Sequence, residues 1–216
     1  MNPQFVASLI AVAVILLVGF PVHEFSHALA ADRLGDRTAR HLGRLSLDPR
    51  VHFDPLGAGL LVLSAIAGGF FVGWAKPTPV NPANLQGGHR GEAIVAGAGP
   101  VSNLIMAGLV AIAVRVIIAF ALLNPSAGSV QELLLEILLY LILINVFLFI
   151  FNLLPIPPLD GYKVLLGAVS PRTAWQIRRY EQYALLLIVV LFLFGGPIIG
   201  PIGTGIANFL VGQTIF

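Results

Sequence analysis

Apolar residues are gathered into long blocks along this chain of 216 residues, and polar stretches separate the blocks. The blocks contain almost no charged side chains and cover residues 5–22, 56–74, 93–123, 133–151 and 184–194. A helix needs about 20 predominantly apolar residues to cross the hydrocarbon core of a bilayer. Three of the blocks reach or approach this length, so the pattern predicts membrane-spanning helices.

The composition agrees with a membrane protein. Hydrophobic residues make up 57% of the chain, charged residues make up 10%, and the mean hydropathy is +0.93, whereas charged residues make up about a quarter of a typical soluble domain. We therefore predict an all-α polytopic membrane protein with one membrane-embedded domain over residues 1–216. No basic side chain precedes the first apolar block and no small-residue cleavage site follows it, which favours a retained membrane helix over a secretory signal.

Residue content excludes two kinds of site. The chain has no cysteine, so disulfides and thiolate metal sites are excluded, and a metal must bind histidine, aspartate or glutamate. The chain also has no run of lysine or arginine and a formal net charge of only +2, so we expect no nucleic-acid partner.

Basic residues are unevenly distributed and predict an orientation. Of the 12 lysines and arginines, all but Arg115 lie within residues 31–92 or 154–183. Loops rich in these residues stay in the cytosol. Both stretches are therefore predicted to face the cytosol, and residues 124–131 are predicted to face the outside.

This orientation makes the block at residues 56–74 begin and end on the cytosolic side, which predicts a re-entrant element. Its glycines suit a bent, closely packed path: Gly57, Gly59, Gly68, Gly69 and Gly73. An ordinary span is the alternative. The alternate prolines of residues 76–82 predict an extended segment on the cytosolic side. Residues 184–216 are predicted to add C-terminal helices that span once or twice.

The end of the first apolar block carries an H-E-x-x-H motif, His23-Glu24-Phe25-Ser26-His27. Residues four apart share one helix face, so both imidazoles can bind one zinc ion while Glu24 acts as general base toward its water. Ionisable side chains at the end of an apolar helix are costly in hydrocarbon and are functional by default. The alternative is a polar helix end that dips into the lipid headgroups.

A catalytic zinc ion takes three protein ligands and keeps a fourth position for water. Asp160 is the best third candidate, because it follows the block at residues 133–151 by a short proline-rich turn and emerges on the same face as His27. Its alternative is a helix N-cap. The other candidates lie in cytosolic loops or at the opposite membrane face: His41, His52, His89, Glu132 and Glu136. The first block rises about 27 Å through a core of about 30 Å, which predicts a zinc site near the cytosolic edge.

Three motifs together resemble those of the site-2 protease family of intramembrane metalloproteases, in particular its small members without PDZ or CBS domains. The H-E-x-x-H motif matches its zinc motif, residues 152–161 (NLLPIPPLDG) match its second motif, and residues 99–103 (GPVSN) match a third. The resemblance implies that Asp160 is the third ligand. It also implies a three-helix catalytic core at about 4–30, 93–123 and 132–153.

The same resemblance implies intramembrane proteolysis of membrane-protein substrates in a lipid bilayer, by a multi-pass protein of a prokaryotic cell membrane with its active site toward the cytosol. A membrane helix shields its peptide bonds through internal hydrogen bonds, so cleavage needs local unwinding. The unwound strand could pair with a backbone edge within residues 47–82. Two alternatives remain, a metal-ion transporter and a catalytically inactive membrane-protein binder.

Two asparagines are further candidate site residues. Asn103 and Asn152 could donate hydrogen bonds to the developing oxyanion or position the substrate strand. The alternatives are interhelical bonding for Asn103 and helix capping for Asn152. Gly97, Gly99 and Gly108 are predicted to be points of close packing between helices.

Overall fold

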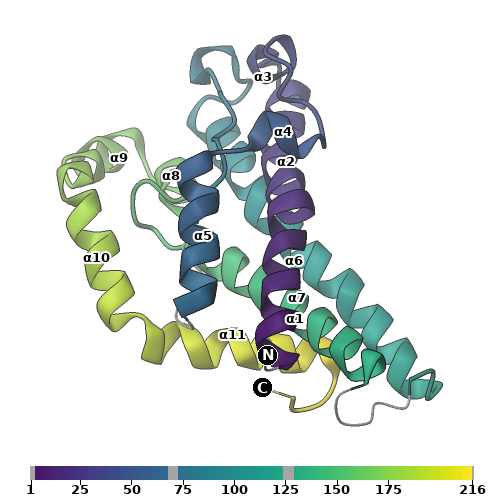
Figure 1. The fold of residues 1–216 in the computed structure, drawn as a ribbon. Coiled ribbons are helices and arrows are strands. Elements are labelled where there is room, and N and C mark those ends of the chain that lie inside the picture. The colour runs from purple at the N-terminus through teal and green to yellow at the C-terminus, as the bar shows by residue number, and fades with distance from the viewer. Residues whose placement is uncertain (1–2, 68–72, 124–128, 216) are drawn as a thin grey trace.

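The computed structural model describes residues 3–67, 73–123 and 129–215, and across these residues the chain is helical without a strand (Figure 1). Three helices are long and apolar enough to cross a membrane, namely Gln4–Arg33, His89–Ala119 (α6) and Val130–Asn152 (α7). The first of them comprises α1 (Pro3–Val14), the π-helical turn η1 (Ile15–Gly19) and α2 (Phe20–Arg33). The predicted all-α membrane protein is confirmed. The block at residues 93–123 forms α6, which begins and ends about one turn earlier than the block, and the polar residues 89–92 form the first turn of this helix.

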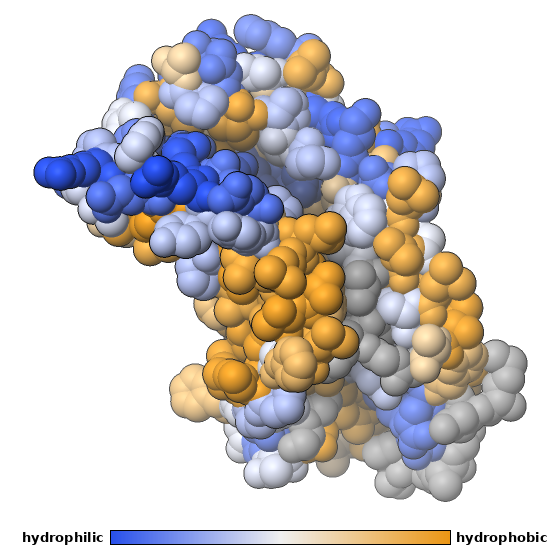
Figure 2. Space-filling model, turned by 90° about the vertical axis from the view of Figure 1, so that its left-hand side faces the viewer, coloured by the Kyte–Doolittle hydropathy of each residue, from blue (hydrophilic) through white to orange (hydrophobic). Residues whose placement is uncertain are grey.

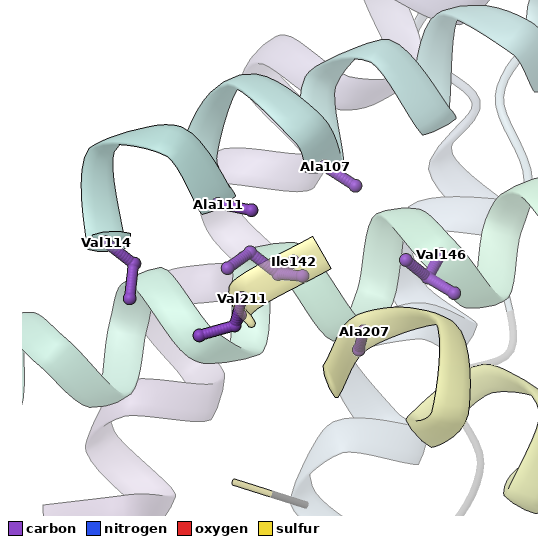
Figure 3. Packing of buried hydrophobic residues seen from close by; sticks show 7 residues of the cluster. All are labelled: Ala107, Ala111, Val114, Ile142, Val146, Ala207 and Val211. Carbon is purple, nitrogen blue, oxygen red and sulfur yellow. The ribbon is translucent and has the colours of Figure 1, made fainter. Parts of the chain in front are cut away.

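Small side chains let the spans approach one another. Alanines of α6 pack against branched residues of α7 and against α11 (Gly196–Val211), as Figure 3 shows. This buried cluster comprises Ala107, Ala111, Val114, Ile142, Val146, Ala207 and Val211. Lipid tails are as apolar as these side chains, so the helices associate through close van der Waals packing. A second cluster joins α1 to α7 through Ala11, Ile15 and Ile144.

The block at residues 56–74 returns to the level at which it starts. It begins with α5 (Pro55–Ala67), and a Cβ atom on Gly57 would lie 2.0 Å from the Trp74 carbonyl oxygen. A Cβ atom on Gly73 would lie 2.5 Å from Leu61 Cβ. The two ends of the block therefore lie together, as a re-entrant element requires. Of its other glycines, Gly59 makes no close approach, and Gly68 and Gly69 lie outside the described residues.

Short elements connect and flank the spans. The predicted non-helical segment is confirmed, because residues 73–81 carry no regular structure before the 3₁₀ turn η2 (Pro82–Asn84). The others are α3 (Thr38–His41), α4 (Pro49–His52), α8 (Asp160–Ala168), α9 (Pro171–Arg178), η3 (Glu181–Tyr183) and α10 (Ala184–Phe194).

The C-terminal region is bent. The helical stretch Pro171–Phe194 and α11 meet at 70° and together amount to one broken span at most, or to a re-entrant pair. Figure 1 shows α10 descending from α9 and α11 crossing the opposite end of the molecule. Arg115 of α6 holds α11 there, since Nε donates to the Leu210 carbonyl at 2.7 Å and a terminal nitrogen donates to the Phe209 carbonyl at 2.8 Å. The last carbonyls of a helix otherwise lack partners.

Replacing this arginine should loosen α11. Arg115→Gln removes the charged donor to two helix-end carbonyls and should lower the free energy of unfolding by about 1–2 kcal/mol. Thermal unfolding in detergent micelles measures the change. Arg90→Gln on the same helix, where the side chain is exposed, is the matched control. An equal change in both variants would contradict the anchoring role of Arg115.

Candidate metal centre

The first span changes its winding just before the H-E-x-x-H motif. Pro21 has no N–H, and its ring crowds the carbonyl four residues earlier. The chain widens there into the π-helical turn η1, in which the Phe20 N–H donates to the Ile15 carbonyl, and α2 then continues regularly to Arg33. Single π-helical turns are frequent at functional sites. Beyond this turn, the motif's polar side chains lie on the buried side of α2.

Three side chains from two distant parts of the chain meet in a tight triangle. His23 Nε2 and His27 Nε2 lie 3.1 Å apart, and each lies 3.2 Å from Asp160 Oδ2. Tetrahedral zinc with bonds near 2.0–2.1 Å separates its ligand atoms by about 3.3–3.4 Å. The triangle therefore fits one ion of this size after only a slight expansion. Among the described residues, this is the group of three histidine and acidic side chains that could hold a metal ion.

The far nitrogens of the two imidazoles contact α6. His27 Nδ1 lies 2.7 Å from the Val95 carbonyl oxygen, so it carries the proton and leaves Nε2 free to bind a metal. His23 Nδ1 lies 3.1 Å from Asn103 Nδ2. The amide oxygen of Asn103 is buried without a hydrogen-bond partner among the described residues. Turning this amide by half a rotation lets the oxygen accept from His23 Nδ1–H, which frees the second Nε2 as well.

A glycine lets α6 approach the imidazoles. A Cβ atom on Gly99 would lie 2.3 Å from His27 Nε2 and 2.6 Å from His23 Nε2. The predicted close packing at Gly99 is therefore confirmed. The prediction for Gly108 is wrong, because nothing lies within 4 Å of an added Cβ atom there, and Gly97 makes only an ordinary contact with Val164.

Asp160 is the first residue of α8, and the capping position before it is occupied by Leu159 without a side-chain cap bond. The alternative reading of Asp160 as an N-cap is thus not realised. The preceding turn brings the backbone back tightly, since a Cβ atom on Gly161 would lie 2.1 Å from the Leu153 carbonyl oxygen. Burial alone would raise the pKa of Asp160, but hydrogen bonds to His23 and His27 hold it well below its usual range.

Glu24 is held by the segment of residues 75–81, which follows the apolar block at residues 56–74 and has no regular secondary structure. Its Oε2 accepts from the Thr78 backbone N–H at 2.7 Å, and the Thr78 hydroxyl donates to the Glu24 backbone carbonyl at 2.9 Å. The segment is fixed on either side, because the Lys76 N–H donates to the His52 carbonyl at 2.8 Å and the Asn81 N–H donates to Asp36 Oδ2 at 2.7 Å. We call these two hydrogen bonds between Thr78 and Glu24 the clamp. The sequence analysis did not predict it, and its only signal in the sequence is a threonine between two prolines.

Asp36 anchors the far end of this segment and is fully buried. Burial alone would raise the pKa of Asp36, but hydrogen bonds from Thr38, Asn81 and Asn84 bring it below its usual range. The carboxylate is therefore a fixed structural acceptor. It ties the segment to the end of the first span.

A cavity of about 520 Å³ opens onto these groups. Besides the triangle and Glu24, its walls include Trp74, Thr78, Asn103, Phe151, Asn152 and Lys163. One amide N–H of Asn152 donates to the Leu148 carbonyl within α7 at 3.0 Å. Both predicted asparagines thus line the cavity, each with a contact to a neighbouring group. The histidines set aside as ligands lie elsewhere, for example His52, whose Nε2 lies 2.7 Å from the Ser46 carbonyl oxygen.

Adding a methyl group at Gly99 should disrupt the triangle. Gly99→Ala places Cβ against both imidazoles and should lower zinc affinity by at least about tenfold, the usual lower bound for disturbing a ligand's surroundings. Gly108→Ala adds the same methyl group where there is open space. Elemental analysis of the purified variants, with thermal unfolding as a check on folding, measures the difference. Equal zinc content in the two folded variants would contradict the geometry.

Comparisons with a family model and with individual proteins agree on the family of this chain. The model of peptidase family M50 matches residues 11–196. "Putative zinc metalloprotease YwhC" of Bacillus subtilis is 38% identical over 178 residues, which are 82% of this chain and 78% of that protein. "Putative zinc metalloprotease Rip2" of Mycobacterium tuberculosis is 34% identical over 178 residues, and the match covers 82% of this chain and 64% of Rip2, just under two thirds. No solved structure matches the chain. The chain belongs to peptidase family M50, the site-2 protease family.

Proposed function

We propose that this protein hydrolyses peptide bonds in the membrane-spanning segments of other proteins, with one zinc ion held by His23, His27 and Asp160. The observation that carries the proposal is the triangle of ligand atoms 3.1–3.2 Å apart with Glu24 beside it, at the wall of a cavity. Family membership supports peptidase chemistry, and the names of YwhC and Rip2 support zinc. Histidine and carboxylate donors are the set that catalytic zinc uses in proteins without thiolate ligands.

Glu24 is the general base of this proposal. A zinc ion held by His23, His27 and Asp160 would lower the pKa of a bound water molecule and would polarise the scissile carbonyl. Glu24 takes a proton from the water and returns it to the leaving amine. The Thr78 N–H donates to Oε2, which leaves Oε1 available for this transfer. Thr78 thereby positions the base without contacting the reacting atoms.

The two asparagines have separate roles in the proposal. Asn103 contacts His23 and orients that imidazole by accepting from Nδ1–H in its turned position. Asn152 uses one amide hydrogen within α7, and an amide nitrogen carries two. Its second hydrogen can donate to the substrate backbone or to the oxyanion, because the side chain lines the cavity.

The substrate is proposed to enter as an extended strand. A spanning helix shields its own peptide groups, so the scissile region must unwind first. Residues 73–81 carry no regular secondary structure, and several of them line the cavity. They provide a backbone edge beside the metal centre to which such a strand can add.

The setting of the enzyme is part of the same proposal. The spans Gln4–Arg33, α6 and α7 form one catalytic domain. Eleven of the 12 basic residues lie within residues 31–92 and 154–183. These stretches include α3, α4, α8 and α9, which lie toward the same end of the molecule (Figure 1), and α8 begins with Asp160. This distribution favours a cytosolic active site. The relatives YwhC and Rip2 come from bacteria, which supports a prokaryotic cell membrane.

Replacing the proposed base tests the function directly. Glu24→Gln keeps the shape of the side chain and should retain zinc but lower cleavage of a membrane peptide in reconstituted vesicles by about 10²–10⁴-fold. Glu92→Gln, which also removes a carboxylate from the cavity wall, is the matched control. Cleavage by Glu24→Gln at the wild-type rate would remove this residue from its role. Zinc uptake into the vesicles without any cleavage by the wild type would indicate transport instead.

The clamp on Glu24 is tested at Thr78. Thr78→Val removes the hydroxyl donor at nearly constant volume, and one hydrogen bond contributes about 0.5–1.5 kcal/mol. The turnover rate should therefore fall by about twofold to thirteenfold at unchanged zinc content. Thr78→Ser keeps the donor and should retain most of the rate. Equal turnover rates in the two variants would show that the hydroxyl bond to the Glu24 backbone carbonyl does not help to position the base.

A further inference from the structure

An exposed surface next to the metal centre combines arginines with aromatic rings. It is formed by α9 and by the turn that joins α9 to η3, and we call it the α9–η3 surface: Arg172, Trp175, Arg178, Arg179 and Tyr180. Trp175 is 64% exposed and Tyr180 is 62% exposed. The Arg179 guanidinium lies 5.3 Å from the centre of the Trp175 ring.

Contacts with α8 fix the position of the α9–η3 surface. Ala174 of α9 packs against Tyr162 and Leu166 of α8. The Tyr162 hydroxyl donates to Glu181 at 2.9 Å, and burial together with this bond raises the pKa of Tyr162 to about 12. The hydroxyl therefore stays protonated as a donor. Since α8 begins with Asp160, the α9–η3 surface is packed on the helix that carries one corner of the triangle.

The α9–η3 surface lies where the polar and apolar parts of the molecule meet. Helix α10 begins directly after η3 and is apolar throughout. Its leucines are open to the surroundings, with Leu185 at 78% and Leu193 at 68% exposure. Figure 2, which views this side of the molecule, shows a hydrophilic region above a hydrophobic one. Tryptophan and tyrosine concentrate at this depth in membrane proteins, at the level of the headgroups.

The charge of the surface selects an anionic partner. Residues 171–183 contain three arginines and one acidic residue, Glu181. Glu181 is bonded to Tyr162 and lies 3.9 Å from Arg178, so Arg172 and Arg179 are the less neutralised cations. Guanidinium groups match phosphate oxygens in geometry and charge. A phosphate carried by a lipid also explains the aromatic residues and the adjoining apolar helix, which a phosphate ion in solution would not require.

We infer that the α9–η3 surface binds the phosphate groups of anionic phospholipids in the leaflet nearest the metal centre. Such headgroups attract basic segments at the cytoplasmic face of a membrane. A bound headgroup would also hold α8, and with it Asp160, at the bilayer surface. Only this last consequence rests on the proposed function, since lipid binding itself does not require proteolysis.

The test is a lipid-selective quenching experiment on the full chain. The protein is reconstituted in vesicles of equal parts phosphatidylcholine and phosphatidylglycerol, and either one lipid or the other carries brominated chains that quench tryptophan fluorescence. Subtracting the signal of Trp175→Phe removes the contribution of Trp74. The Trp175 signal should be quenched more strongly when the brominated lipid is phosphatidylglycerol. Equal quenching by the two lipids in the wild-type protein would overturn the inference.

Two triple variants identify the residues responsible. Replacing Arg172, Arg178 and Arg179 by glutamine should abolish the preference for phosphatidylglycerol. A control that removes the same charge from exposed positions elsewhere at the polar end replaces Arg33, Arg37 and Arg90 by glutamine, and it should keep the preference. Loss of the preference in the control, or its retention in the first variant, would show that general charge attraction rather than this surface binds the lipid.

Discussion

Burying two imidazoles and a carboxylate in an apolar helical bundle is the constraint on which this structure depends. Polar groups removed from water are costly unless they are paired, and here His23, His27 and Asp160 meet one another at 3.1–3.2 Å. That meeting requires α6 to pass close behind the imidazoles, which only a residue without a side chain permits at Gly99. It also requires the chain to turn back tightly after α7. The position of the Asp160 carboxylate beside the imidazoles therefore depends on how the three spans pack.

The segment of residues 75–81 fixes the position of Glu24 beside the metal ligands. Glu24 belongs to the first span, yet its carboxylate is fixed by a backbone N–H from Thr78. Asp36 and His52 in turn fix the segment on both sides of that contact. The proposed base and the proposed substrate edge thus belong to one connected unit. A strand that docks along the segment would be aligned with the base by the same hydrogen bonds.

Much of this was predictable from sequence because it follows from local periodicity and from chemistry at fixed spacing. The spans follow from the apolar blocks, the non-helical segment at residues 76–82 follows from its alternate prolines, and the approach of His23 to His27 follows from their spacing of four residues. Asp160 is predicted from the short proline-rich turn after the block at residues 133–151 and from the resemblance to the site-2 protease family. Tertiary contacts explain the remainder. The bond between Thr78 and Glu24, the capping of α11 by Arg115 and the open space at Gly108 depend on which helices pack together. A sequence pattern does not encode such contacts one by one.

The central claim is that two imidazoles and one carboxylate share a single zinc ion. X-ray absorption at the zinc edge of the purified protein measures the number and type of ligands directly. The account predicts one zinc ion per chain with two histidine nitrogens and oxygen ligands at about 2.0–2.1 Å, and the loss of this spectrum when His27 is replaced by alanine. A zinc shell with fewer than two imidazoles, or one unchanged in that variant, would contradict it.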